Sequence, residues 1–157
     1  MSEVAAELVT VRIVGLPLAV HRRAQQHGEA MRREFFLILE QEHARPGSVP
    51  DRLLELSQSL AGRYAGFTDE QETAIETAID AGVEVMDDLL FMLPADVAGA
   101  VDELEAVLDE ADAWCRSGGL LTLATPDDLV EYRRWDLDNF RRQVAGGAPQ
   151  PWVGATR

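Results

Sequence analysis

Residues 97–115 of the chain read VAGAVDELEAVLDEADAWC and hold its most regular pattern. Apolar side chains recur along this stretch at alternating intervals of four and three residues: Val97, Val101, Leu104, Leu108, Ala111 and Cys115. That alternation places them along one side of an α-helix, in the seam that a helix presents to other helices. The stretch therefore predicts a half-buried helix that packs against further helices.

Signals for helix starts and ends extend this pattern in both directions. Ser117-Gly118-Gly119 ends the helix, and Thr125-Pro126-Asp127-Asp128 combines a cap, a proline in the first turn and two acids that suit the helix dipole. Thr68 and Gln71 have the spacing of a capping box. Together these signals predict five helices, over residues 17–43, 50–66, 68–82, 94–117 and 126–146.

Strand signals are few. Residues 7–15, ELVTVRIVG, are rich in β-branched and apolar side chains and predict one short strand. Residues 85–93 are compatible with either a strand or a short helix. We therefore expect a mainly α fold, a compact bundle or array of about five helices with one or two short strands, forming a single domain over residues 1–147.

An extended tail over residues 148–157 follows that domain. Pro149 and Pro151 prevent the tail from continuing the preceding helix, and Trp152 carries a large apolar ring. We expect the tail to dock on a folded surface, with Trp152 as its anchor and Val153 beside it. Docking on a second copy of the chain would make the protein a homodimer, whereas docking on its own domain would cap the bundle.

Charge and composition exclude several classes of protein. The 157 residues include 28 acidic side chains against 14 arginines and no lysine, for a net charge of −14. Nucleic acids and anionic membranes are bound through basic patches, so neither is an expected partner. A P-loop requires lysine, and neither Gly-x-Gly-x-x-Gly nor Gly-x-Ser-x-Gly occurs, so we expect no nucleotide and no other cofactor. The absence of lysine is typical of a GC-rich bacterial genome.

The single Cys115 bears on the cellular compartment. One cysteine cannot form an internal disulfide, which favours a reducing environment. The sequence has neither a recognisable signal peptide nor an apolar run of membrane-spanning length. We therefore expect a cytoplasmic protein in which Cys115, on the apolar seam, acts as a small buried hydrophobe.

Charge is distributed unevenly along the chain. Residues 67–128 carry a net charge of −16, which makes this acidic centre either a solvated surface or a docking face for a basic partner. Eight of the 14 arginines form four adjacent pairs on predicted helices, and Arg134 and Arg141 lie two turns apart on one helix face. Such arginines either pair with the acidic centre or bind an acidic or phosphorylated partner.

Few residues suggest catalysis or metal binding, and we predict no catalytic and no metal-binding residue. Glu40 and His43 form the Glu-x-x-His pair of di-metal bundles, but this pair occurs only once. His21 and His27 lie on different sides of their helix and are interpreted as satisfied surface or boundary residues. The acidic pair Asp87-Asp88 lies among apolar residues, so we expect it to be partly buried, with a turn or a helix start as the alternative.

Three stretches carry a resemblance to a known family: Val9–Ala24 (VTVRIVGLPLAVHRRA), Leu120–Pro126 (LLTLATP) and Tyr132–Trp135 (YRRW). They resemble an uncharacterised family of actinobacterial helical proteins associated with anti-sigma-factor kinases and their antagonists, the partner-switching regulators. The resemblance implies a regulatory role. It does not imply kinase activity, because the Asn-containing ATP box and the Gly-rich lid of those kinases are missing.

Two functions agree with these features. The first is a non-catalytic regulatory or protein–protein interaction module, for example in partner-switching stress signalling, with a protein partner. Its candidate interaction residues are Trp152, Arg134, Arg141, Asp87 and Asp88. The second is a small-ligand-binding or enzymatic helical bundle with an interior polar cluster. A filled core with an exposed apolar or charged face would indicate the first, whereas a closed pocket of roughly 300 Å³ or more with convergent polar groups would indicate the second.

Overall fold

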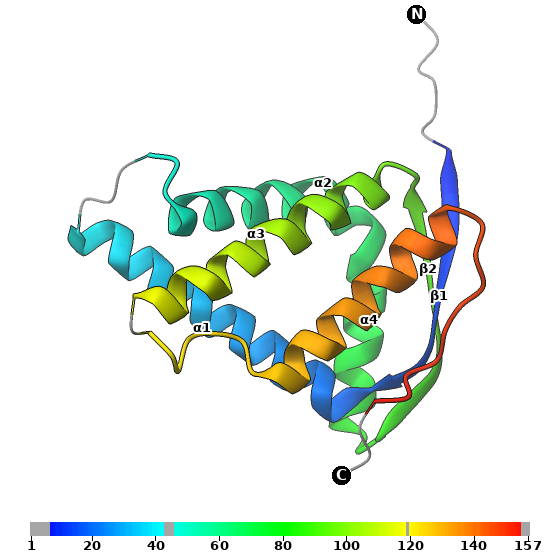
Figure 1. The fold of residues 1–157 in the computed structure, drawn as a ribbon. Coiled ribbons are helices and arrows are strands. Elements are labelled where there is room, and N and C mark those ends of the chain that lie inside the picture. Colours follow the sequence, from blue (N-terminus) through cyan, green and yellow to red (C-terminus); the bar gives the residue numbers. More distant parts are fainter. Residues whose placement is uncertain (1–6, 43–45, 119, 155–157) are drawn as a thin grey trace, which may run out of the picture.

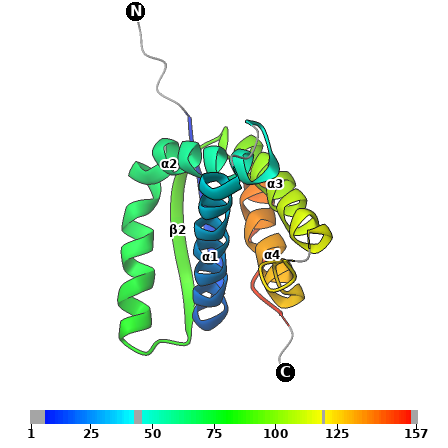
Figure 2. The ribbon, with the colours of Figure 1, turned by 90° about the vertical axis from the view of Figure 1, so that its left-hand side faces the viewer.

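A computed structural model describes residues 7–42, 46–118 and 120–154 of the chain. Within these residues the chain forms four helices and a two-stranded antiparallel sheet, which confirms the mainly α class (Figure 1). The elements in order are β1 (Leu8–Pro17), α1 (Leu18–Glu42), α2 (Val49–Asp80), β2 (Val85–Pro94), α3 (Val97–Ser117) and α4 (Asp127–Val144). The sheet forms one side of the molecule, and α1, α2 and α4 pack against it (Figures 1 and 2).

The two strands are distant in the sequence and pair in antiparallel register, with Ile13 opposite Leu89 near the middle. Side chains alternate between the two faces of the sheet, so Val11 and Ile13 are buried while Arg12 between them is exposed. Residues 85–93, which the sequence left open, thus belong to a strand rather than to a helix.

Gly15 explains why β1 extends beyond its predicted end. Its φ of +69° is a conformation that glycine adopts without strain, and it shifts the alternation of the strand so that Leu16 is buried next. The strand therefore continues through Pro17, and α1 begins at Leu18 rather than at the proline.

Helix α2 corrects the prediction of two separate helices on either side of Gly66. It is one continuous helix of 32 residues that bends midway (Figure 1). The hydroxyl of Thr68 does not cap a new helix but donates to the Tyr64 carbonyl one turn earlier, at 3.3 Å, a bond that is associated with helix bending. Gln71 donates from Nε2 to the Leu90 carbonyl of β2, at 2.8 Å. The predicted capping box is therefore wrong, because both of its side chains have other partners.

The apolar core is divided into three clusters. The first joins the sheet to α1, α2 and α4, and includes Val11, Ile13 and Tyr132. The second holds together the far ends of α1 and α3 and the beginning of α2, and includes Met31, Phe35 and Cys115. The third joins the middle of α2 to β2, α3 and α4, and includes Tyr64, Leu93 and Val101. The space between the three clusters is a cleft.

Candidate functional site: a cleft between the helices

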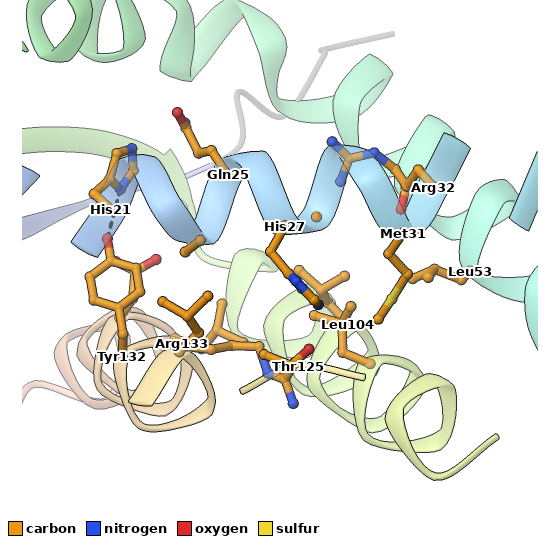
Figure 3. A pocket seen from close by; sticks show the side chains of 17 residues that line it. His21, Gln25, His27, Met31, Arg32, Leu53, Leu104, Thr125, Tyr132 and Arg133 are labelled. Atoms are coloured by element: carbon orange, nitrogen blue, oxygen red, sulfur yellow. Dashed lines mark hydrogen bonds between the residues drawn. The ribbon is translucent and has the colours of Figure 1, made fainter. Parts of the chain in front are cut away.

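A cleft of about 260 Å³ lies between α1, α3, α4 and the first half of α2 (Figure 3). Its apolar wall is formed by Met31, Leu53, Leu104, Leu108, Leu129 and Leu137. Its polar groups come mainly from α1 and α4 and include His21, His27, Tyr132, Arg133 and Asp136. An apolar wall with a few polar groups is the usual composition of a small-ligand site.

The cleft exists because α1 carries small residues where it faces the other helices. Ala24 and Gly28 are one turn apart and both line the cleft, between the buried Leu18 and the buried Met31. A larger side chain at Ala24 would extend into the space, whereas a Cβ at Gly28 would lie 3.3 Å from Arg32 Nη1. The sequence of α1 therefore keeps the three core clusters apart along this face.

His21 and Tyr132 meet across one end of the cleft (Figure 3). The His21 Nδ1 and the Tyr132 hydroxyl are 2.6 Å apart, and the two rings are arranged edge to face. Burial lowers the pKa of His21, so the imidazole is neutral at physiological pH. Its Nε2 is buried and has no hydrogen-bond partner among the described residues.

Asp136 lies one turn after Tyr132 on α4 and lines the same cleft. Burial raises the pKa of its carboxyl group to about 7, and burial together with the Asp136 charge raises the pKa of Tyr132. Asp136 is half-buried, and it lines the cleft. Its accessible surface therefore borders the confined space of the cleft, so the carboxyl group is poorly solvated. No hydrogen bond or ion pair to this carboxyl is present within residues 7–42, 46–118 and 120–154.

His27 faces the cleft from the next turns of α1 (Figure 3). Its Nε2 is also buried without a partner in the described part of the chain. His21 and His27 are half-buried boundary residues, as interpreted, but each has one ring nitrogen without a hydrogen bond to the described residues, and neither of these nitrogens has surface exposed to the cleft. The described residues contain no group of three or more His, Cys, Asp or Glu side chains placed to hold a metal ion.

Arg133 and Asp112 close another side of the cleft through a buried network. Arg133 donates to Asp112 at 3.1 Å and to the exposed Asp109 at 2.9 Å. The other oxygen of Asp112 accepts from the Thr125 backbone N–H at 2.9 Å and from the Thr125 hydroxyl at 2.7 Å. Thr125 was predicted to cap α4, but its hydroxyl is committed to Asp112, and Pro126 occupies the cap position.

Two arginines predicted as interaction residues have different surroundings. Arg141 is bound by acidic residues, with its Nε 2.6 Å from Asp102 and further ion pairs to Glu105 and Asp138. Arg134 is exposed and has no ion pair to any described residue. The two arginines therefore do not act as one binding face, because Arg141 pairs with α3 within the chain.

The acidic pair Asp87-Asp88 does not contribute to the cleft. Both residues are exposed on β2, which makes the expected partial burial wrong. Asp88 faces outward opposite Val14 and pairs with Arg12 of β1 at 3.1 Å. Of the flanking apolar residues only Leu89 is buried, whereas Val85 and Leu90 are exposed, so local hydrophobicity did not indicate burial here.

The tail docks on the domain of its own chain, and Trp152 is its anchor. After α4 the chain turns back and runs beside β1 (Figure 1), where Gly15 lies close to the Trp152 backbone. The Trp152 ring packs edge to face against Trp135 and Tyr132, with ring centres 5.3 and 5.7 Å apart. Val153, expected beside the anchor, is 90% exposed, so that part of the prediction is wrong.

Two further predicted residues lie away from the cleft. Cys115 is fully buried in the second core cluster, as its position on the seam predicts, and burial raises the pKa of its thiol to about 11. Glu40 is exposed near the end of α1, and His43 lies outside the described residues. Over those residues no helix is both long and apolar enough to cross a bilayer.

Asp136 is the residue that the sequence analysis missed. A signal for it exists, because Asp136 follows Leu129 by seven residues and Tyr132 by four, which places one acid on the inward face of α4. Comparisons with protein-family models, with curated proteins and with solved structures find no match to this chain.

Proposed function

We propose that the protein binds a small molecule in the cleft between α1, α3 and α4. The observation that supports this proposal is the Asp136 carboxyl, which lines an otherwise apolar space and has no hydrogen bond or ion pair to any described residue. A poorly solvated polar group without a partner costs folding free energy, about 1–3 kcal/mol, and a ligand that bonds to Asp136 would remove this cost.

The size of the cleft limits the ligand. A cavity of roughly 150 Å³ holds a benzene molecule. The 260 Å³ of this open cleft are less than the closed pocket of roughly 300 Å³ expected for a ligand-binding bundle, and they suit a smaller ligand, a ring with a short polar chain. For such a ligand we expect a dissociation constant of about 0.1–1 mM from probes that are not optimised for the site.

The methionines allow a direct test. Met31 lines the cleft, whereas Met86 and Met92 lie on β2, so ¹³C-methyl labelling of methionine gives one reporter and two internal controls. We would titrate the protein with 2-phenylethylamine, 2-phenylethanol and phenylacetate. At least one probe is expected to shift the Met31 signal while leaving Met86 in place. If none of the three moves Met31 at about 10 mM, the proposed function is wrong.

A variant that fills the cleft provides the matched control. Ala24→Leu places three more carbon atoms in the cleft and should abolish the Met31 shift, while the helix remains intact. Ala61→Leu makes the same chemical change on the exposed side of α2 and should leave binding unchanged. Equal binding by both variants would place the probe outside the cleft.

A protein–protein interaction module remains the second candidate, and one observation favours it. Four apolar side chains, each at least 36% exposed, line a groove between β2 and the second half of α2: Leu8, Phe67, Leu90 and Met92. Glu70 is the one charged residue among those that line this groove, so two acidic chains can meet here with little repulsion. For this candidate we propose a second copy of the chain as the occupant.

Sedimentation equilibrium tests the second candidate. If two copies meet at this groove, the wild-type mass should approach that of a dimer with increasing concentration, and Met92→Asp should return it to the monomer mass. The Met92 methyl signal should broaden over the same range. A wild-type chain that remains monomeric at millimolar concentration would exclude self-association through this surface.

A further inference from the structure

We propose that the ligand of the cleft is an organic cation, with an ammonium group at Asp136 and an apolar body lying toward Met31 and Leu53. This inference rests on the proposed function and adds the chemical class of the ligand. It is carried by the charge balance of the cleft walls, by the neutral groups beside Asp136 and by the shape of the space.

Asp136 is the one acidic residue among those that line the cleft, and it has no cation of its own. Arg133, three residues earlier on α4, is paired with Asp109 and Asp112, so its positive charge is already compensated by two carboxylates. Arg32 also borders the cleft, but it is exposed and its guanidinium lies on the side of α1 away from Tyr132 (Figure 3). The walls therefore present an uncompensated carboxyl group to any ligand.

A positive ligand suits this environment better than a neutral or a negative one. Burial without a counter-charge raises the pKa of Asp136 to about 7, and an ammonium group beside it would restore the ionised form. An anionic ligand would instead meet the Asp136 charge in a poorly solvated space. The net charge of −14 further raises the local concentration of cations around the protein.

The neighbours of Asp136 suit an ammonium group. His21 is kept neutral by its lowered pKa, so it does not repel a cation. The ring of His27 also lines the cleft, and its unpartnered Nε2 is buried behind that lining.

The opposite end of the cleft suits an apolar body. Met31, Leu53, Leu104 and Leu108 line it from α1, α2 and α3. None of these side chains can hydrogen-bond to the ligand strongly, so this end favours an aromatic or aliphatic group. The geometry thus points to a primary amine on a short chain that ends in a ring or a branched alkyl group.

The three probes named above separate the ligand classes, because they share one ring and a similar chain and differ in charge. In wild-type protein at pH 7.5, 2-phenylethylamine should shift the Met31 signal at a concentration at least tenfold lower than 2-phenylethanol. Phenylacetate should bind most weakly. If the alcohol binds as tightly as the amine, the inference is overturned while the proposed function stands. If no probe moves Met31, both fail.

Two variants assign the selectivity to one carboxyl group. Asp136→Asn should weaken amine binding at least tenfold and change alcohol binding less than twofold. Glu131→Gln removes the same charge from the exposed side of α4 and should leave amine binding unchanged. Equal losses in both variants would show that the amine responds only to the overall charge of the protein and would overturn the inference. Because the comparison of probes uses wild-type protein, the test does not depend on the stability of either variant.

Discussion

Asn139 and Gln143, one turn apart on α4, each hold a single backbone residue through a pair of hydrogen bonds. The amide of Gln143 accepts from the Arg12 N–H and donates to the Arg12 carbonyl, both at 2.8 Å. The amide of Asn139 accepts from the Gln150 N–H at 3.0 Å and donates to the Gln150 carbonyl at 3.3 Å. Two side chains of one helix thus satisfy the free edge of β1 and fasten the tail, where a third strand would otherwise be needed.

These two amides should contribute unequally to stability. Asn139 is 2% exposed, and Asn139→Leu removes the acceptor of the Gln150 N–H while the Gln150 carbonyl keeps its bond from Trp135 Nε1, so we expect a loss of about 1–2 kcal/mol of unfolding free energy. Gln143→Leu affects a more exposed site and should cost about 1 kcal/mol. Urea unfolding measures both, with the exposed Gln26→Leu as the control. Equal, small losses in all three variants would contradict the role of the amides.

The buried ion pair of Asp112 should matter far more than its exposed neighbour. Asp112→Ala leaves the Arg133 guanidinium and the Thr125 N–H without a buried acceptor, and we expect a loss of about 3–5 kcal/mol. Asp109→Ala removes an exposed partner of the same arginine and should cost less than about 1 kcal/mol. Thermal or urea unfolding of the two variants provides the measurement, and similar losses would refute the prediction.

Asp136 should make stability depend on pH in an unusual direction. Its pKa is raised on folding, so the folded state holds a proton that the unfolded state releases, and this group lowers stability as the pH rises from about 4 to 7. Asp136→Asn should therefore be more stable than wild type by about 1–3 kcal/mol at pH 8. This gain is smaller than the full pKa shift would give, because the half-buried side chain borders a cleft that solvent can enter. The advantage should shrink steadily toward pH 4. A difference that does not vary with pH would show that Asp136 titrates normally.

Ligand binding should also depend on pH if the ligand is a cation. An alkylammonium stays protonated up to about pH 9, so any change in its affinity below that pH comes from titration of the protein. The affinity of wild type for 2-phenylethylamine should rise about tenfold between pH 5.5 and 7.5, and that of Asp136→Asn less than twofold. The other ionisable residues that line the cleft are His21, His27 and Arg32 from α1, and Tyr132 and Arg133 from α4. Isothermal titration calorimetry over this range gives the comparison.

The docked tail should stabilise a single chain rather than a dimer. Removal of residues 148–157 uncovers the Trp135 and Tyr132 rings and should lower the unfolding free energy by about 2–3 kcal/mol, or the melting temperature by roughly 5–10 °C. Trp152→Ala alone should account for most of that loss. Light scattering should show the same number of chains per particle before and after truncation. If truncation lowers that number, the tail joins two copies.

Patterns along a single helix predicted the elements and part of the core. The seam of residues 97–115 is helical, and Val97, Val101, Ala111 and Cys115 are buried as expected. Leu104 and Leu108, in the middle of that seam, instead line the cleft. Periodicity shows which face of a helix turns inward. It does not show whether side chains from another helix pack against that face or leave an open cleft. The cleft depends on Ala24 and Gly28 of another helix, so it could not be predicted from α3 alone.

The tail and the acidic pair show the same limit. A large ring after two prolines was enough to predict an anchor, because exposing Trp152 to water is unfavourable wherever it lies. The partners of that ring and the outward position of Val153 depend on the path of the tail past Gly15. Likewise, Asp88 lies among apolar residues in sequence, but it lies on the outer face of β2 beside the exposed Leu90, and only Leu89 turns to the core. Both outcomes are set by tertiary packing.

The pairing of β1 with β2 has a consequence for the order of folding during synthesis. The chain between Pro17 and Val85, which contains α1 and α2, must leave the ribosome before the two strands can meet. At roughly 5–20 residues per second, β1 waits several seconds with Val11 and Ile13 uncovered. Helices α1 and α2 can form locally in that time, but the edge of β1 is satisfied only when Gln143 arrives near the end of the chain. The newly made protein therefore passes through a period in which an apolar strand is available to chaperones or to other nascent chains.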